Sequence, residues 1–237
     1  MQRLIRKLRR AILNSDPSFC DMYEDAHARA AAEEYLAPIR RHLREQFGDR
    51  KLTILDAGCQ AGRLLIPLAE EGHSLIGVDT SGFALRRARR HAQEQGLSIR
   101  FHQGSIASIR QWVPPASLDA AICAEVLYLC EDYRELFGLL VESVKPGGLV
   151  CVSHRPPAFY IAVALRAGQR ELAGEIARRR EGPTAEGRYH NWQTESELRD
   201  WYRDEGLHVV GCYPVDYTMM GPDGRVPQYL LMAAQKT

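Results

Sequence analysis

The sequence predicts an α/β protein whose core is a three-layer, doubly wound sheet, mostly parallel, with a C-terminal antiparallel strand pair. Three observations lead to this prediction. From residue 51 onward, short apolar runs alternate with helical patterns. A turn that contains glycine follows the first apolar run directly. The C-terminal region holds two longer apolar runs joined by a loop of turn-forming residues.

The elements of the predicted sheet follow one another with short connections. The expected strands are Thr53–Asp56, Ser74–Asp79, Ser98–His102, Leu118–Cys123 and Leu149–Ser153. The expected helices between them are Gly62–Glu71, Gly82–Gln95 and Tyr133–Val144, and KPGG at 145–148 is a strong break before the fifth strand. Two last strands, Leu207–Tyr217 and Gln228–Ala234, form the antiparallel pair, because MMGPDGRVP between them is typical of a hairpin connection.

Residues 155–200 interrupt this alternation. A helical pattern over Ala158–Arg180 is followed by the loop EGPTAEGRYHNW. A short helix then begins after Thr194, with Glu197 three residues later, as in a capping box. The segment is too large for a plain connection, so we expect it to cap a ligand site.

The N-terminal residues are predicted to form a short, basic amphipathic helix. Its apolar face holds Leu4, Ile5, Leu8 and Ile12. Docking on its own domain, or on a second subunit of a homodimer, is favoured over a membrane surface, because so short a helix is a weak membrane signal. We therefore expect residues 1–48 to form helices that pack on or cap the core, and residues 49–237 to form one domain with the cap inserted at about 155–200.

The composition is that of an ordinary globular protein, with 45% hydrophobic residues, 26% charged residues and a net charge of +1. We expect no nucleic-acid partner, and the basic run LRRARRHAQ is expected to be a solvated helix face. No apolar run is long enough to span a bilayer, so no stable membrane insertion is expected. Six cysteines lie scattered without the spacing of a metal site, which favours a reduced, cytoplasmic protein that binds no metal.

The turn after the first strand has the residues of a nucleotide-binding loop. Gly58 and Gly62 let the backbone approach a ligand, and Asp56 precedes them at the strand end. A second acid, Asp79, ends the next strand roughly 20 residues later, the offset at which a carboxylate accepts hydrogen bonds from ribose hydroxyls. Together they indicate a ligand that contains adenosine. The dinucleotide pattern GxGxxG is absent, since Leu65 stands where its third glycine is expected.

These motifs resemble those of the class I S-adenosylmethionine-dependent methyltransferases. LDAGCQAG is similar to their first motif, usually D-x-G-x-G-x-G, and LIGVDTSGFALRRAR is similar to the second. LDAAICAEVLYLC resembles their fourth strand and active-site loop, and VKPGGLVCVS the junction before the fifth strand. The resemblance covers about residues 50–155 closely. It implies the fold, S-adenosyl-L-methionine as the cofactor, and methyl transfer.

The resemblance also implies a role for each matching residue. Asp56, Gly58 and Gly62 shape the pocket for the methionine part of the cofactor, and Asp79 binds the ribose. The other positions expected at the cofactor are Thr80, Ser105 and Ile106 around the adenine, Ala124 and Glu125 towards the substrate, and Tyr23, which closes over the cofactor.

Two residues depart from the family pattern. Gln60 occupies the place of a usual glycine, and Ser105 that of a usual aspartate. A glutamine at φ > 0 adds roughly 1 kcal/mol of strain. We therefore expect the loop to bind the cofactor still, with Gln60 forming a hydrogen bond near the methionine end.

Methyl transfer requires mainly the alignment of a nucleophile in a dry site, with a base nearby. His154, at the end of the fifth strand, and Glu125, after the fourth, are the candidate catalytic residues. The alternatives are a satisfied polar residue for His154 and an ion pair with an arginine such as Arg155 for Glu125. The candidate substrate residues are Tyr128, Arg155, Tyr160, Tyr189, His190 and Trp192, and for the aromatic ones ordinary packing is the alternative.

The resulting hypothesis is methyl transfer from S-adenosylmethionine to an oxygen or nitrogen of a small molecule. The absence of an N/D-P-P-Y motif after the fourth strand disfavours methylation of amino groups on nucleic-acid bases. Two alternatives remain. One is a catalytically silent protein that binds S-adenosylmethionine or serves as a scaffold, which Gln60 and Ser105 leave open. The other is a nicotinamide-dependent oxidoreductase, which the missing GxGxxG disfavours.

The role of Asp79 leads to a prediction. Asp79→Ala should lower the affinity for S-adenosylmethionine at least about tenfold, because a hydrogen bond to a charged group contributes roughly 1.5–3 kcal/mol. Calorimetric titration of both proteins measures the change. An unchanged affinity would show that Asp79 does not bind the ribose.

Overall fold

The computed structural model describes residues 26–215, 220–221 and 224–237. The predicted N-terminal helix and Tyr23 lie outside the described residues. In the described part, no helix is long and apolar enough to cross a membrane.

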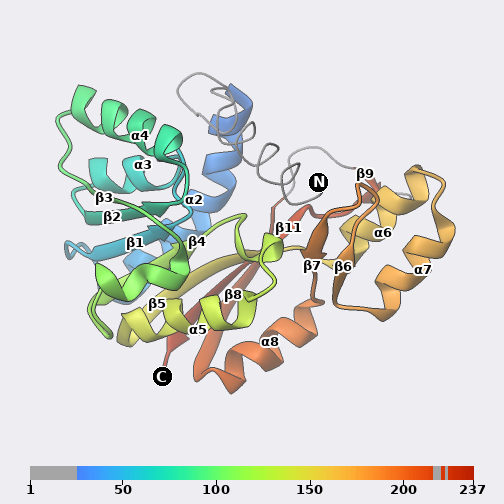
Figure 1. The fold of residues 1–237 in the computed structure, drawn as a ribbon. Coiled ribbons are helices and arrows are strands. Elements are labelled where there is room, and N and C mark those ends of the chain that lie inside the picture. The colour runs from blue at the N-terminus through green and yellow to red at the C-terminus, as the bar shows by residue number, and fades with distance from the viewer. Residues whose placement is uncertain (1–25, 216–219, 222–223) are drawn as a thin grey trace.

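A seven-stranded sheet of order β3-β2-β1-β4-β5-β11-β8 forms the centre of the molecule (Figure 1). Its strands are β1 (Thr53–Ala57), β2 (Ser74–Asp79), β3 (Arg100–Gln103), β4 (Leu118–Cys123), β5 (Val144–His154), β8 (Leu207–Val215) and β11 (Tyr229–Lys236). Within this sheet, β11 runs antiparallel to both of its neighbours, β5 and β8, and the other neighbouring pairs are parallel. The predicted fold class is therefore confirmed, with β11 inserted between β5 and β8.

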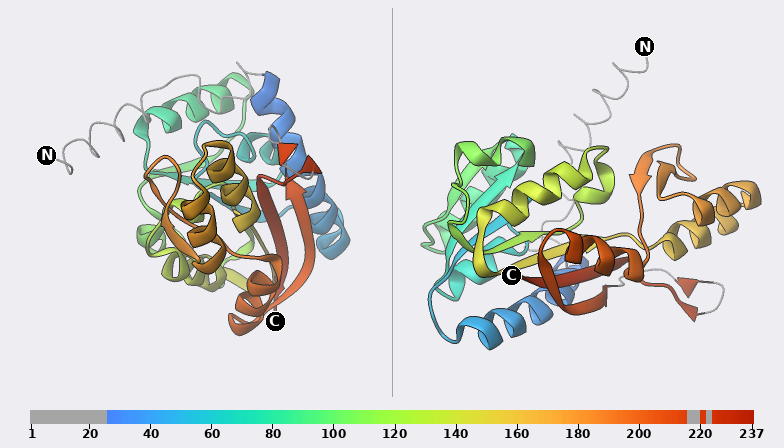
Figure 2. Two further views of the ribbon diagram at one scale, coloured as in Figure 1. Left: turned by 90° about the vertical axis from the view of Figure 1, so that its right-hand side faces the viewer. Right: turned by 90° about the horizontal axis from the view of Figure 1, so that it is seen from below.

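Helices cover both faces of the sheet (Figures 1 and 2). They are α2 (Ala26–Phe47), α3 (Leu65–Glu70), α4 (Gly82–Glu94), α5 (Tyr133–Ser143), α6 (Pro157–Arg166), α7 (Arg170–Arg178) and α8 (Glu195–Asp204), with 3₁₀ turns η1 (Ile106–Gln111) and η2 (Leu127–Leu129). The predicted first helix is shorter than expected, since residues 60–64 form turns before α3 begins.

Side chains of the strands alternate between two apolar layers, which is why the strands read as nearly continuous apolar runs. In β4, Ala121 and Cys123 belong to the layer covered by α5 and α8. Ala120 and Ile122 belong to the layer covered by α2, α3 and α4. This period-2 alternation decides which end-of-strand side chains can reach a ligand.

A cap follows β5 and consists of α6, α7 and the hairpin of β6 (Glu181–Pro183) and β7 (Tyr189–Asn191). Figure 2 shows it extending to one side of the sheet. The single helix expected over Ala158–Arg180 is wrong, because Gly168, at φ +73°, follows α6 and separates it from α7. The Asn191 amide donates to the carbonyl oxygens of Leu127 and Cys130, and so ties the cap to the loop after β4.

The short helix predicted after Thr194 is α8, and it belongs to the core and not to the cap. The Thr194 hydroxyl accepts the Glu197 N–H at 3.3 Å, and the Glu197 carboxylate accepts the Thr194 N–H at 2.9 Å. This is the predicted capping box. It fixes the start of a helix whose buried residues are Leu198, Trp201 and Tyr202.

Removal of this cap should lower the stability. Thr194→Ala should reduce the free energy of unfolding by about 1 kcal/mol, because the first-turn N–H groups lose an acceptor. Urea denaturation measures the change. Ser196→Ala, which deletes an exposed hydroxyl inside the same helix, is the control and should have almost no effect; equal losses in the two variants would contradict this account.

Candidate functional site

The loop between β1 and α3 crosses the carboxyl edge of the sheet in a conformation that requires glycine. Gly58 and Gly62 have φ values of +87° and +94°. A Cβ atom on Gly58 would overlap the Val126 side chain, and one on Gly62 would lie 2.7 Å from Cδ1 of Ile66. Neither position has room for a side chain, and at Gly58 the loop packs against the Val126 side chain that follows β4.

Gln60 lies between these glycines and also has a positive φ, 45°. The conformation costs an L-residue about 1–2 kcal/mol, so the loop stores strain at this point. The backbone N–H of Gln60 donates to Oδ2 of Asp79 at 2.9 Å, and this hydrogen bond holds the strained turn in place.

Asp79 ends β2 and is 9% exposed. Its Oδ1 accepts the Ser81 N–H at 2.7 Å, at the start of α4, while Oδ2 accepts the Gln60 N–H. Burial raises the pKa of the Asp79 carboxyl above its ordinary value, and the two N–H donors offset part of that rise. Each carboxylate oxygen retains further capacity to accept a hydrogen bond.

Asp56 lies beside this pair, 3% exposed at the end of β1. Burial raises the pKa of the Asp56 carboxyl to about 7; the Arg63 guanidinium opposes the rise and the nearby Asp79 adds to it. Two buried carboxyl groups and one buried guanidinium thus surround the glycine loop, which makes this edge of the sheet a strongly polar site in an apolar interior.

The turn after β3 lies on the other side of Asp79. Ser105 caps η1, because its hydroxyl accepts the Ala107 N–H at 3.3 Å. Thr80 and Ser105 are exposed, whereas Ile106 is 5% exposed and packs in the core. The two exposed residues flank the end of β2.

Glu125 follows Ala124 at the end of β4 and has a φ of 62°, a strained value for glutamate. Its backbone N–H donates to the Ser153 hydroxyl at 2.7 Å. Its carboxylate accepts Nη2 of Arg63 at 2.6 Å and the Tyr229 hydroxyl at 3.2 Å. The Glu125 carboxylate therefore links the glycine loop to β11.

The chain of contacts continues from β11 to the cap. The Tyr229 hydroxyl accepts Nη2 of Arg155 at 2.6 Å, at the end of β5. Aromatic rings surround the Arg155 guanidinium, and its Cζ lies 4.1 Å from the ring centroids of both Phe159 and Tyr229. Charged and aromatic groups thus extend from the loop after β1 to the first helix of the cap.

Known proteins share this architecture. A protein-family model described as a methyltransferase domain matches residues 54–148. The chain is 31% identical over 171 residues to the ubiquinone biosynthesis O-methyltransferase of Rickettsia canadensis, covering 71% of this chain and 68% of that protein. It is 29% identical over 183 residues to the enzyme of the same name from Pseudomonas paraeruginosa, covering 76% of this chain and 75% of that one. The chain belongs to the S-adenosylmethionine-dependent methyltransferases.

Solved structures agree on the fold. The 1,6-didemethyltoxoflavin-N1-methyltransferase of Burkholderia thailandensis matches with a TM-score of 0.67 at 21% identity, covering 100% of this chain and 90% of that one. The magnesium protoporphyrin IX methyltransferase of Synechocystis matches with a TM-score of 0.64 at 19% identity, covering 90% and 84%. Both of those structures contain S-adenosylhomocysteine.

The predicted family, enzyme class and cofactor are therefore confirmed. The predicted S-adenosylmethionine-dependent methylation of a small molecule is confirmed as well. This membership favours a working methyltransferase over the silent protein and over the nicotinamide-dependent oxidoreductase.

The residues at the carboxyl edge fit S-adenosylmethionine. Asp79 offers acceptor oxygens for ribose hydroxyls where β2 ends. The glycine loop admits a ligand because Gly58 and Gly62 carry no side chain. Burial raises the pKa of both Asp56 and Asp79, and the positive charge of the cofactor's sulfonium would favour their ionised forms. The assignment of these residues to the cofactor stays a prediction, and the geometry of the loop and of Asp79 supports it.

His154 lies apart from this group. The alternation of β5 sends it to the layer of α5 and α8, with Val150 and Val152. Its Nε2 shares a 2.9 Å hydrogen bond with the Tyr202 hydroxyl, and burial lowers the pKa of the imidazole to about 3. The geometry favours the alternative reading, a satisfied polar residue at a strand end.

The predicted substrate residues divide into two groups. Tyr128 and Tyr160 lie around Arg155, and the Tyr160 hydroxyl shares a 2.6 Å hydrogen bond with Nδ1 of His190. Trp192 is 1% exposed, and its Nε1 donates to two backbone oxygens within the cap. Tyr189 donates to the Glu181 carboxylate on the neighbouring strand β6. Trp192 and Tyr189 thus make contacts within the cap, whereas Tyr128 and Tyr160 lie at Arg155.

Sequence reasoning missed Arg63, Tyr229 and Ser153. Arg63 stands directly after Gly62 in the loop motif, so its position was readable from the sequence. Tyr229 begins β11, and it reaches the carboxyl edge of the parallel strands because β11 runs antiparallel to β5. Ser153 precedes His154 and faces the opposite layer. Strand direction and alternation are the signals that identify the last two.

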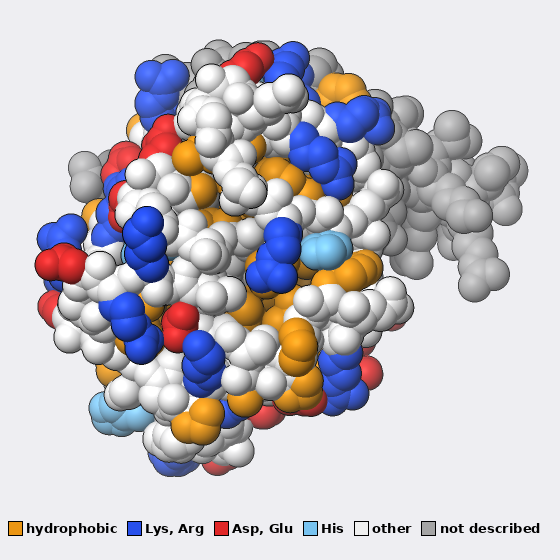
Figure 3. Space-filling model, turned by 90° about the vertical axis from the view of Figure 1, so that its left-hand side faces the viewer, with side chains coloured by type: hydrophobic (Ala, Val, Ile, Leu, Met, Phe, Trp, Pro, Cys, Tyr) orange, Lys and Arg blue, Asp and Glu red, His pale blue; other side chains and the backbone are white. Residues whose placement is uncertain are grey.

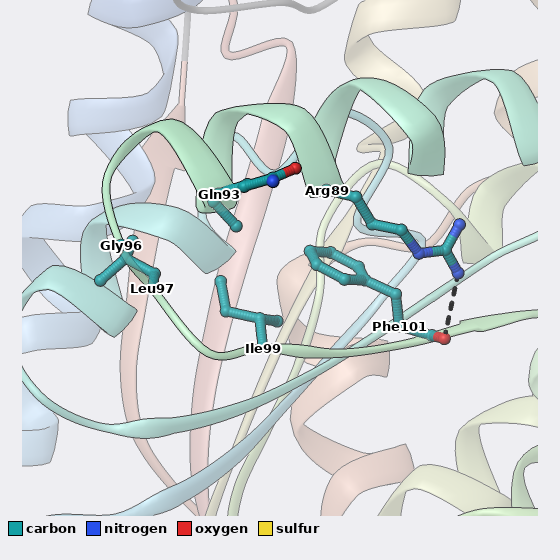
Figure 4. A pocket seen from close by; sticks show the side chains of 7 residues that line it. Arg89, Gln93, Gly96, Leu97, Ile99 and Phe101 are labelled. Atoms are coloured by element: carbon teal, nitrogen blue, oxygen red, sulfur yellow. Dashed lines mark hydrogen bonds between the residues drawn. The ribbon is translucent and has the colours of Figure 1, made fainter.

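A surface pocket lies elsewhere, between the end of α4 and the edge strand β3 (Figure 4). Phe101 and Ile99 form its floor, and Nη2 of Arg89 donates to the Phe101 carbonyl oxygen at 3.2 Å. It opens near the amino end of β3, away from the carboxyl edge that holds Asp79. It therefore lies apart from the residues predicted to bind the cofactor.

The basic run on α4 lies on this same side of the molecule. Figure 3 shows Lys and Arg side chains scattered over this side of the molecule, with uncharged, apolar and acidic groups between them. The expected absence of a nucleic-acid partner stays a prediction.

The geometry of Gln60 yields a prediction. Gln60→Gly should relieve the backbone strain at φ > 0, but glycine also loses more conformational entropy when the loop is ordered, so the two effects should nearly cancel. The affinity for S-adenosylhomocysteine should therefore change less than about threefold. Calorimetric titration measures it. The control is Gly58→Ala, which should weaken binding strongly, because its methyl group meets Val126. An affinity gain of tenfold or more in Gln60→Gly would show that the glutamine side chain obstructs the site.

Proposed function

We propose that the protein transfers the methyl group of S-adenosylmethionine to an oxygen atom of a small molecule that binds between the carboxyl edge of the sheet and the cap. The observation that carries this proposal is the position of Glu125. Its carboxylate contacts Arg63 of the cofactor loop on one side and Tyr229, the partner of Arg155, on the other. Oxygen is favoured as the acceptor because the relatives that match over two thirds or more of their length are named O-methyltransferases.

The cofactor, when bound, supplies an electrophilic methyl group on a sulfonium. The protein then has to orient the acceptor hydroxyl and take up its proton. We assign the uptake of this proton to Glu125. Of the two predicted catalytic residues, Glu125 lies beside the glycine loop and His154 does not. The strained backbone at Glu125 and its contacts with Arg63 and Tyr229 hold the carboxylate in one orientation. Asp79 would hold the ribose, and Asp56, Gly58 and Gly62 would surround the methionine part.

Three further expectations belong to the proposal. We keep the cytoplasmic location, the absence of a nucleic-acid partner and the homodimer as predictions from the sequence. In the residues that the structure describes, no group of three or more His, Cys, Asp or Glu side chains is placed to hold a metal ion.

Calorimetry and a transfer assay test the function. The protein should bind S-adenosylmethionine and S-adenosylhomocysteine but not NAD, and it should move a labelled methyl group to a phenolic hydroxyl in preference to an arylamine. Binding of NAD alone, or transfer to the amine alone, would contradict the proposal.

Glu125→Gln tests the role of the carboxylate. The variant should lower kcat about 10²–10⁴-fold, because proton transfer by a positioned base contributes this much. Affinity for S-adenosylhomocysteine should stay within a few-fold of the original. Glu131→Gln removes an exposed carboxylate after η2 and is the control. A kcat loss as small as that of the control would remove Glu125 from the mechanism.

A further inference from the structure

Arg155 is a buried cation enclosed by aromatic rings. It is 8% exposed and lies where β5 ends and the cap begins. The distances from its Cζ to the ring centroids are 4.1 Å for Phe159 and Tyr229, 4.8 Å for Tyr128 and 5.7 Å for Tyr160. These rings come from the cap helix α6, from η2 and from β11, so three separate segments converge on one guanidinium.

This guanidinium is incompletely paired. Its Nη2 donates to the Tyr229 hydroxyl at 2.6 Å, and hydrogen bonding with the Tyr128 side chain helps to raise the pKa of Arg155, but the buried Nε and Nη1 have no hydrogen-bond partner among the described residues. Arg63, the other buried arginine of the described chain, donates Nη2 to the Glu125 carboxylate at 2.6 Å. Burial of a charge without a carboxylate partner is costly, and contacts with ring faces offset only part of that cost. The arrangement therefore lacks an anion.

We propose that Arg155 binds a carboxylate group of the substrate, and that the methyl acceptor is a hydroxy acid. This inference rests on the proposed function and names its substrate class. A guanidinium presents parallel N–H donors that match the two oxygens of a carboxylate. The surrounding rings of Tyr128, Tyr160 and Tyr229 are buried themselves, so they exclude water from a carboxylate bound to the guanidinium and strengthen the ion pair.

The charges nearby favour a carboxylate over a phosphate. His190 is the other nitrogen base at the cage, through its hydrogen bond with Tyr160. Burial lowers the pKa of His190 to about 4, and the charges of Arg155 and Arg188 add to this effect. The imidazole is therefore neutral near pH 7, and the cage supplies one positive charge. One guanidinium balances a carboxylate but leaves a phosphate dianion undercompensated.

Tyr229 relates the carboxylate to the reaction. Its hydroxyl accepts Nη2 of Arg155 and donates to the Glu125 carboxylate at 3.2 Å. A substrate held at Arg155 by its acid group thus lies one side chain away from the proposed base. Phe159, on α6, is only half-buried, so rotation of this ring opens the guanidinium at the lowest cost in lost packing.

Binding measurements that do not depend on turnover test the proposal. The protein saturated with S-adenosylhomocysteine is titrated with the three isomeric hydroxybenzoates and with the matching neutral hydroxybenzamides. At least one acid should bind about tenfold or more tightly than its amide, since a hydrogen-bonded charge pair has this strength. In Arg155→Met the acid and the amide should bind equally, and in Arg155→Lys the preference should be reduced, because the planar fork is lost.

The controls separate the outcomes. Arg166→Met, an exposed arginine at the end of α6, should keep the full preference for the acid. S-adenosylhomocysteine should bind the Arg155 variants as it binds the original protein, and this also shows that the variants fold. Equal affinity for acid and amide in the original protein, no binding of any acid, or a preference that survives in Arg155→Met would overturn the proposal. Failure of the proposed function would appear differently, as absent binding of S-adenosylhomocysteine, and the titrations repeated without it would still give the ratio of acid to amide.

Discussion

The Asp79 carboxylate accepts one N–H from the loop after β1 and another from the turn that begins α4. These two hydrogen bonds fix three segments relative to one another at the carboxyl edge of the sheet. The strained φ of Gln60 persists because its N–H is held by a buried carboxylate, and the glycines on either side leave no side chain in the way. The shape of the proposed cofactor site thus depends on Asp79 even without a ligand.

A second set of contacts depends on the direction of β11. Because this strand runs against β5 and β8, its first residue, Tyr229, lies at the edge where the parallel strands end. There its hydroxyl joins Glu125, which is paired with Arg63, to Arg155, which is enclosed by the cap. The antiparallel strand therefore links the glycine loop to Arg155, where we propose that the substrate binds.

Features that depend on short stretches of sequence could be predicted, whereas contacts that depend on the order of strands in the sheet could not. The strands β2 and β4, the glycine loop, Asp79 and the capping box at Thr194 follow from short patterns with a direct physical meaning, and the structure has them at the predicted residues. Tyr229 was missed because its place beside Glu125 requires the order β5-β11-β8, which no local pattern encodes. His154 was selected for its position at a strand end, but alternation along β5 turns it towards Tyr202 and turns Arg155 towards the other layer. The single helix expected over Ala158–Arg180 failed at Gly168, a glycine with positive φ inside an otherwise helical pattern.

The central claim is that Asp79, with the loop that it holds, forms the cofactor site. A crystal structure of the protein with S-adenosylhomocysteine tests it most directly. The account predicts both ribose hydroxyls within hydrogen-bond distance of the Asp79 carboxylate, about 2.5–3.0 Å, with the Gln60 N–H still bound to Oδ2. A ribose placed away from Asp79, or a loop that releases Asp79 when the ligand binds, would contradict it.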